Sequence, residues 1–195
     1  MSDFKSILAA VEKHIALDDT ERGAFVSVLT SRLLKPGDFV EKTGEPSLHF
    51  IYVVSGCLMT YYPDKEGVER VIQFATSGWW TGDLHSFTKK VPSIYSTRTL
   101  TESEVFLLTK ADLDQLLEKA PKFEKYFRIL FQNSIVAHQH RLIQAYSATA
   151  EERYQTFREK FSSLEQYVPQ KYIASYLGVT PEFLSKIRRR LMEKE

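Results

Sequence analysis

The sequence contains a single cysteine, Cys57, among its 195 residues. One cysteine cannot form a disulfide within the chain, and it cannot supply the four thiolates that hold an iron–sulfur cluster. No apolar run approaches the roughly 18 residues that cross a bilayer, and no leader of charged, apolar and small residues opens the chain. We therefore expect a cytoplasmic protein without a membrane partner.

The sequence also lacks the common motifs of enzymes. It has no nucleophile elbow, no Walker loop, and no cluster of carboxylates or of His and Cys at catalytic spacing. The histidines that could be considered as ligands, His49, His85, His138 and His140, do not have the spacing of metal ligands. These absences argue against an enzyme and against a bound metal.

The net charge of +1 conceals a local excess of basic residues at the end of the chain. After Val168 the basic residues are Lys171, Lys186, Arg188, Arg189, Arg190 and Lys194, and the acidic residues are Glu182, Glu193 and Glu195. A basic end on a nearly neutral chain fits a protein that meets nucleic acid with one module. The chain is long enough for one large or two small domains.

Residues 168–190 read as two short amphipathic helices that meet at Gly178. Apolar residues recur at intervals of three and four: Ile173 and Leu177 in the first helix, and Leu184, Ile187 and Leu191 in the second. Gly178 can adopt the left-handed conformation that ends a helix, Thr180 can cap the next helix, and Pro181 suits its first position. This pattern predicts a helix-turn-helix.

The exposed face of the second helix predicts contact with DNA. The expected DNA-binding residues are Thr180, Pro181, Glu182, Ser185, Lys186, Arg188, Arg189 and Arg190. Glu182 can accept a hydrogen bond from a cytosine amino group and Lys186 can donate to guanine, whereas the arginines suit phosphates. The alternative is an ordinary helical hairpin with a solvated basic end, but small Ala174, the glycine, the cap and the apolar positions together favour DNA.

Residues 33–109 contain short runs of β-branched and aromatic residues separated by glycine and proline turns. The predicted strands are residues 48–56, 57–62, 68–75 and 96–109. Helices are expected over residues 4–15, from Asp18 or Asp19 to Leu29, and over residues 111–119 and 121–146. Many short strands at a spacing of roughly 8 to 12 residues predict an antiparallel sandwich or barrel-like roll.

An ordered series of turn residues makes a family resemblance specific. The series is Pro36-Gly37-Asp38, Gly44, Phe50 to Gly56, Gly78 and Gly82-Asp83-Leu84. It resembles the cyclic nucleotide-binding β-roll, and with the C-terminal hairpin nearly the whole chain resembles a bacterial transcription regulator of the Crp/Fnr family. The resemblance implies an α+β fold, with a cupin-like antiparallel β-roll of the double-stranded β-helix or jelly-roll kind. It implies a sensor over residues 1–146, including a dimerisation helix at about 111–146, and a DNA-binding domain over 147–195.

The resemblance also implies a ligand site in the loop over residues 82–94. Its candidate residues are Gly82, Asp83, Leu84, Ser93 and Ile94. Asp83 falls on the acidic residue that contacts the ribose, but Ser93 replaces the phosphate-binding arginine and Ile94 replaces a small hydroxyl residue. Serine donates one uncharged hydrogen bond where a phosphate favours a bidentate guanidinium, so we expect the usual cyclic nucleotide to be lost or replaced. The alternative is a loop that only packs. No cofactor is identified, and an unidentified small-molecule effector remains possible.

The helix predicted from Pro121 has apolar residues on more than one side. Two such sides imply two partners, which we expect to be the roll of the same chain and the same helix of a second copy. A helix buried only within its own chain is the alternative. Ser147 to Thr149 is the expected hinge, and Thr149 with Glu152 has the pattern of a capping box for a further helix.

These observations predict a homodimeric DNA-binding transcription regulator that reads a roughly palindromic site with the helix from Pro181. The implied partners are double-stranded DNA, a second copy of the chain and RNA polymerase. The competing class is a small-molecule-binding or structural β-roll protein whose C-terminal hairpin mediates protein contact.

Overall fold

The strands of the described chain form two four-stranded antiparallel sheets. The computed structural model describes residues 4–193. One sheet has the strand order β1-β8-β3-β6 and the other has the order β2-β7-β4-β5. The strands are β1 Thr30–Leu34, β2 Phe39–Glu41, β3 His49–Ser55, β4 Cys57–Pro63, β5 Glu69–Thr76, β6 Trp80–Thr81, β7 Ser96–Thr99 and β8 Ser103–Thr109. Together they make up the structure that we call the roll.

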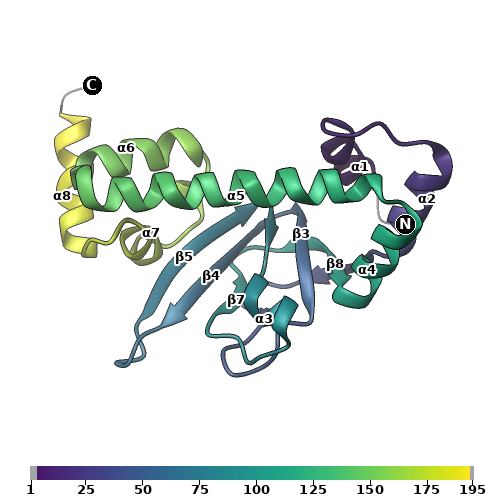
Figure 1. Cartoon of the computed structure of the whole chain (residues 1–195). Helices are drawn as coiled ribbons and strands as arrows, with labels where there is room; N and C mark the ends of the chain where they lie inside the picture. Colours follow the sequence, from purple (N-terminus) through teal and green to yellow (C-terminus); the bar gives the residue numbers. More distant parts are fainter. Residues whose placement is uncertain (1–3, 194–195) are drawn as a thin grey trace.

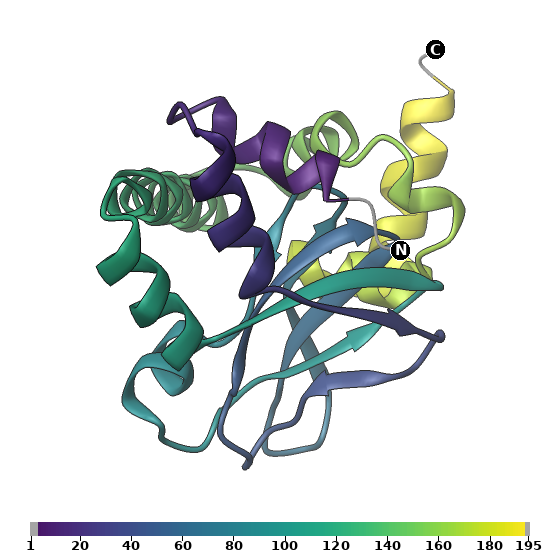
Figure 2. The same cartoon turned by 90° about the vertical axis from the view of Figure 1, so that its right-hand side faces the viewer.

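One long helix, α5, lies across the roll and joins two groups of shorter helices (Figure 1). The helices are α1 Lys5–Glu12, α2 Asp19–Ser27, α3 Leu84–Lys89, α4 Lys110–Lys119, α5 Lys122–Ser147, α6 Ala150–Lys160, α7 Gln170–Leu177 and α8 Pro181–Met192. Helices α1, α2 and α4 gather at one end of the molecule, and α6 to α8, which we call the C-terminal unit, at the other. Figure 2 views α5 nearly end-on, with the strands below it. None of the described helices combines the length and apolarity that a membrane span requires.

Strand β3 shows how the sequence pattern builds the roll. Its side chains alternate between the two faces of the sheet, as in any strand. Ile51 and Val53 pack inside the roll with residues of β1, β4, β5 and β8, whereas Phe50 and Tyr52 face outward into a second cluster. Because both faces are covered, the strand is apolar at consecutive positions.

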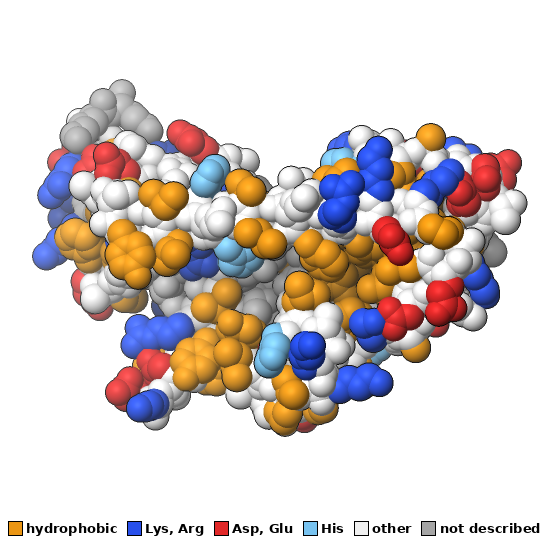
Figure 3. Space-filling model, viewed as in Figure 1, with side chains coloured by type: hydrophobic (Ala, Val, Ile, Leu, Met, Phe, Trp, Pro, Cys, Tyr) orange, Lys and Arg blue, Asp and Glu red, His pale blue; other side chains and the backbone are white. Residues whose placement is uncertain are grey.

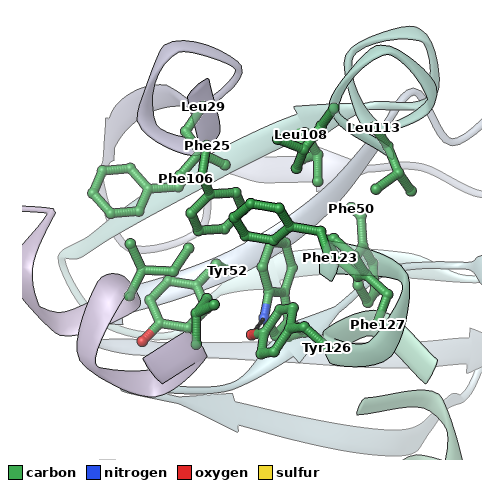
Figure 4. Close-up of a cluster of buried hydrophobic side chains, with 14 of the residues drawn as sticks. Phe25, Leu29, Phe50, Tyr52, Phe106, Leu108, Leu113, Phe123, Tyr126 and Phe127 are labelled. Atoms are coloured by element: carbon green, nitrogen blue, oxygen red, sulfur yellow. Dashed lines mark hydrogen bonds between the residues drawn. The ribbon is translucent and has the colours of Figure 1, made fainter. Parts of the chain in front are cut away.

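The outward-facing cluster holds the N-terminal helices and the start of α5 on the roll. Figure 4 shows its aromatic side chains, which come from α2, β3, β8 and α5. The rings of Phe25 and Phe123 stack at 4.9 Å between centroids, and the indole N–H of Trp80 donates to the hydroxyl of Tyr126 at 2.9 Å. Burying such large rings stabilises this end of α5 against the roll.

A separate cluster joins the roll to the C-terminal unit. Met59, Tyr61, Val71 and Phe74 project from β4 and β5 toward α6, α7 and α8. The ring of Phe74 meets that of Phe161 edge-on at 6.2 Å between centroids. The C-terminal unit therefore shares a hydrophobic core with one face of the roll.

The structure corrects part of the strand prediction. Residues 96–109 do not form one strand, because the chain leaves β7 in one sheet and enters β8 in the other. The corner is held by Cys57, whose backbone N–H donates to Thr101 Oγ1 and whose carbonyl accepts from the N–H of Leu100. No glycine or proline marks this corner, and the sequence pattern also missed the short strands β1, β2 and β6.

The predicted helix boundaries are confirmed where a local cap defines them. Asp18 and Thr149 each form a capping box, with Glu21 and Glu152 respectively, and Thr180 accepts from the N–H of Phe183. Helix α5 begins directly after Pro121 and ends at Ser147, close to the predicted limits. These caps satisfy backbone N–H groups that have no partner inside the helix.

Candidate nucleic-acid interface and ligand site

Helices α7 and α8 form a tight hairpin around Gly178. Gly178 has a φ of 69°, and its N–H and that of Val179 donate to carbonyls of the last turn of α7. Side chains with a Cβ rarely adopt this left-handed conformation, so glycine lets the chain reverse within three residues. Ala174 is fully buried, as the sequence predicts for two helices that approach closely.

The buried side of α8 is the predicted apolar stripe of Leu184, Ile187 and Leu191. Because this side is fixed, the opposite side is exposed, and it carries Pro181, Glu182, Ser185, Lys186 and Arg189. Thr180, which is exposed, is the helix cap. The backbone N–H of Glu182 itself and then the hydroxyl of Thr180 donate to this carboxyl group and lower the pKa of Glu182, so it is ionised and can accept hydrogen bonds.

Two of the expected arginines lie against carboxylates of the same chain. Arg188 is partly buried, with its Nε 4.0 Å from Glu165, and Arg190 Nη1 is 3.5 Å from Glu151. Their charge is thus partly offset, in contrast to Lys186 and Arg189 on the exposed face. Surface ion pairs of this kind are weak, so both side chains can exchange partners.

The sequence reasoning missed two residues of this surface. Phe183, in the first turn of α8, is 48% exposed and lies on the same helix as the expected DNA-binding residues. Gln170 at the start of α7 donates from Nε2 to Ser185 Oγ at 3.2 Å, which links the two helices across the exposed side. The hydrophobicity of Phe183 favoured a core position, and nothing in the sequence pairs Gln170 with Ser185.

Helix α7 is docked on β5, which is an edge strand of its sheet. Ser175 Oγ accepts from the N–H of Val71 and donates to the carbonyl of Glu69, both at 2.9 Å. An edge strand has backbone groups without a strand partner, and an uncovered edge can pair with another chain. One serine of the C-terminal unit therefore satisfies two such groups of the roll.

Arginines of the roll and of α5 complete this docking. Arg98 Nη2 donates to Glu69 and to the hydroxyl of Tyr172, both at 2.7 Å. Arg141 of α5 donates to the carbonyls of Ile72 and Val71 in β5 and, at 3.1 Å, to that of Tyr176 in α7. Arg141 thus connects the long helix, the roll and the C-terminal unit.

The predicted ligand loop brings Asp83 and Ser93 together in a buried network. The hydroxyl of Ser93 donates to Asp83 Oδ2 at 2.8 Å, and the N–H of Ser86 donates to Asp83 Oδ1 at 3.0 Å. Both Asp83 and Ser93 are about 95% or more removed from solvent, with 5% and 2% exposure. Leu84 and Ile94 are instead exposed, at 41% and 54%. The loop therefore brings together only part of the predicted residue set.

A second carboxylate, Glu41, lies in the same network, and no local sequence pattern indicates it. Its oxygens accept from the hydroxyls of Ser47 and Thr97 and from the N–H of Asp83. Gly82 is close as well, since a Cβ there would come 3.3 Å from the carbonyl oxygen of His49. Burial raises the pKa of Glu41, and the hydrogen bonds from Ser47 and Thr97 partly oppose that rise.

A cavity of about 510 Å³ lies between the roll and α5. Its wall is rich in aromatic rings, contributed by Phe50, Phe74, Trp79, Trp80, Tyr95, Phe131, Phe161 and Tyr176. Figure 3 shows the recess below the long helix, with hydrophobic, basic and histidine side chains around it. This volume and apolar lining are typical of small-molecule sites.

Comparison with known proteins shows which proteins this chain resembles. Residues 31–120 match the family model described as the cyclic nucleotide-binding domain. The probable transcriptional regulator flp of Lacticaseibacillus casei is 26% identical over 97% of this chain and 89% of its own length. The transcriptional activator protein anr of Pseudomonas aeruginosa is 26% identical over 85% of this chain and 72% of its own length. These similarities support a regulator of the Crp/Fnr type.

A solved structure shares the fold. FixK2 from Bradyrhizobium japonicum superposes with a TM-score of 0.73 over 86% of each chain, at 16% sequence identity. The predicted combination of an antiparallel roll with helices is thereby confirmed as the fold of the cyclic nucleotide-binding domain. The named relatives are transcriptional regulators and not enzymes.

Within this fold, the end of α5 near the C-terminal unit exposes a row of large apolar side chains. The exposed residues are Ile135, Val136, Leu142, Ile143 and Tyr146, with exposed fractions from 47% to 85%. Ile135 and Leu142 are seven residues apart, as are Val136 and Ile143, which is the repeat of a two-stranded coil. Leu130 and Phe131 of the same helix pack instead against the outward-facing cluster of the roll.

The remaining candidates for chemical activity are Cys57 and the histidines. Burial raises the pKa of the Cys57 thiol to about 12, so the group stays protonated and unreactive at neutral pH. His138 Nδ1 lies 2.7 Å from the carbonyl oxygen of Ser134, one turn earlier in α5. In residues 4–193, no three His, Cys, Asp or Glu side chains are grouped so that they could hold a metal ion.

Proposed function

We propose that this protein is a DNA-binding transcription regulator that reads its site with α8. The observation that carries the proposal is the division of α8 into a buried apolar stripe and an exposed face with Glu182, Ser185, Lys186 and Arg189. A helix held in this way can enter the major groove and present its first turns to base edges. The regulatory role of the Crp/Fnr relatives supports the same conclusion.

The regulator acts as a homodimer through α5. The exposed row from Ile135 to Tyr146 would be covered by the same row of a second copy, because residues seven apart lie on one side of a helix and can pack against the same side of a partner helix. Two α8 helices then meet successive major grooves, about 34 Å apart along the duplex, at a roughly palindromic site.

The C-terminal unit is the DNA-binding domain, and the hinge between it and the sensor lies at residues 147–149. Helix α5 ends at Ser147, Ala148 is extended, and Thr149 caps α6. A ligand changes the placement of the C-terminal unit only if it binds one arrangement more tightly than the other.

A cyclic nucleotide is not the effector in the usual way. The carboxylate of Asp83 already accepts from Ser86 and Ser93, and Ser93 replaces the positive charge that would hold a phosphate. A cyclic phosphate placed here would face the buried carboxyls of Asp83 and Glu41 without a guanidinium, which is costly.

The experiment is selection of bound duplexes from a random library by the purified full-length protein at moderate salt, with and without 3′,5′-cyclic AMP. We expect enrichment of one palindromic motif in both conditions. Enrichment only with cyclic AMP would contradict the loss of the phosphate anchor. Absence of any enriched motif, together with duplex binding that does not weaken with salt, would favour a hairpin that contacts protein.

A further inference from the structure

A second cleft, of about 500 Å³, lies between α5, α6 and α7, and its charge is one-sided. Arg141, Arg153 and Lys160 line it, together with His140, Gln144, Thr156 and Ser175. No Asp or Glu is among its lining residues, nor among those of the 510 Å³ cavity, although the chain has 25 acidic residues. Three cations without a counter-charge attract an anion.

None of these three cations forms an ion pair with a carboxylate of residues 4–193. Arg141 donates to backbone carbonyls of β5 and α7, and Arg153 donates to the carbonyls of Leu177 and Ala148. Lys160 Nζ lies 4.8 Å above the ring of Trp79 and makes no hydrogen bond with described residues. Carbonyl groups and a ring face orient these side chains but leave their full charge in place.

The three cations line one cleft, and Arg141 is close enough to Lys160 for their charges to interact. Burial, followed by the positive charge of Arg141, lowers the pKa of Lys160. Neighbouring like charges destabilise each other, and a bound anion would remove that repulsion. An oxyanion that accepts hydrogen bonds from two or more of these cations would offset the repulsion between them.

The cleft continues into the aromatic cavity. Ala137, Arg141, Lys160 and Tyr176 line both spaces. A ligand at this junction would meet rings such as Trp79, Phe161 and Tyr176 as well as the cations Arg153 and Lys160. Such a junction suits a molecule with a flat apolar part and a charged end.

We propose that this junction binds an aromatic oxyanion, with its ring in the cavity and its charged group against Arg141, Lys160 and Arg153. The anion would thus be held by α5 and α6, and not by the loop of Asp83 and Ser93 on the roll. The ligand would touch Phe50 and Trp80 of the roll and Lys160 and Tyr176 of the C-terminal unit. The role of this ligand as an effector rests on the proposed function in transcription. Binding of the ligand to the junction does not depend on that function.

The test is isothermal titration calorimetry of the full-length protein with three probes. These are 1-naphthyl phosphate, 1-naphthol, which has the ring alone, and inorganic phosphate, which has the anion alone. Hydrogen bonds to charged groups are worth about 1.5–3 kcal/mol, so we expect 1-naphthyl phosphate to bind at least about tenfold more tightly than 1-naphthol. Lys160→Gln should reduce this preference about tenfold, because it removes one of the cations that face the phosphate. Lys160 is exposed, so we expect this variant to fold normally.

Lys13→Gln is the matched control, since Lys13 is an exposed lysine beside α1 at the other end of the molecule. It should bind all three probes as the natural protein does. Equal affinity for 1-naphthyl phosphate and 1-naphthol would overturn the proposal. An equal loss of affinity for 1-naphthyl phosphate in Lys160→Gln and Lys13→Gln would overturn it as well. Binding of inorganic phosphate as tightly as 1-naphthyl phosphate would overturn the aromatic part. The titration contains no DNA. A negative result would therefore reject the ligand site without affecting the proposal that the protein binds DNA.

Discussion

The exposed side chains of α8 divide into two kinds by their place along the helix. Glu182 and Lys186 lie in its first turns, whereas Arg189 lies further along. We expect Glu182→Ala and Lys186→Ala each to cost about 1–3 kcal/mol on the preferred duplex and to relax sequence preference. Arg189→Ala should weaken binding to all duplexes and lower the salt slope by about 1. Fluorescence anisotropy on the selected and a scrambled duplex, over a series of salt concentrations, measures both effects. Equal losses on both duplexes for all three variants would contradict this division.

Glu41 should lower the free energy of unfolding as pH rises, whereas a carboxyl group with a lowered pKa has the opposite effect. Burial raises its pKa above the ordinary value of 4.5, so the folded protein keeps this proton to a higher pH than the unfolded chain does. Its contribution is therefore complete below about pH 4.5 and is lost as pH rises through the folded-state pKa, by about 1.4 kcal/mol for each unit of the shift. We expect Glu41→Gln to lose less stability than the natural protein between about pH 4.5 and 8 in urea unfolding. Parallel stability curves for the two proteins would show that Glu41 is not responsible.

Among the secondary-structure elements, α7 and β5 form the contact that positions the C-terminal unit. Ser175→Ala leaves the N–H of Val71 and the carbonyl of Glu69 without their partner, at about 1–3 kcal/mol for a buried group. We expect α7 to separate more often, and the amide of Val71 to exchange hydrogen about tenfold faster or more, while amides of β3 keep their rates. Ser162→Ala is the control, because Ser162 is exposed outside this contact. Unchanged exchange at Val71 would mean that other contacts hold α7 in place.

The sequence predicted those elements whose signals are local. Asp18, Thr149 and Thr180 each cap a helix through a residue three positions later, and a pattern of this length is visible in the sequence. The corner between β7 and β8 was missed because its partner, Cys57, is 44 residues before Thr101. Strands β1 and β2 depend likewise on pairing with distant strands, β8 and β7.

The candidate site shows the same limit. The apolar stripe of α8 could be predicted because its spacing identifies the buried side, and the exposed side follows from it. The role of Glu41 could not be predicted, because its hydrogen-bond partner Thr97 is 56 residues away in the sequence. Arg98 follows the loop closely in sequence, but it lies on β7 and binds Glu69 and Tyr172, so it does not replace the missing phosphate anchor.

For the whole molecule, the exposed row on α5 predicts the oligomeric state. Leu142 is 56% exposed, and Leu142→Glu would place a charge in the proposed interface of both copies. An unpaired buried charge costs about 3–5 kcal/mol, so we expect the dimer dissociation constant to rise at least about a hundredfold. Sedimentation equilibrium over a range of concentrations measures it. Leu33→Glu is the control, because Leu33 is even more exposed, at 75%, but lies on β1. Equal effects of the two substitutions would argue against an α5 interface.

Helix α5 has 26 residues and is therefore about 39 Å long. Its first turns are clamped by aromatic packing, and its last turn leads into the C-terminal unit (Figure 1). A tilt of about 10° at the clamped end moves the far end by about 7 Å, roughly twice the 3.4 Å rise of one base pair. In the proposed dimer this helix would act as a lever, so that a small repacking at its clamped end would shift each α8 helix by about two base pairs along the duplex.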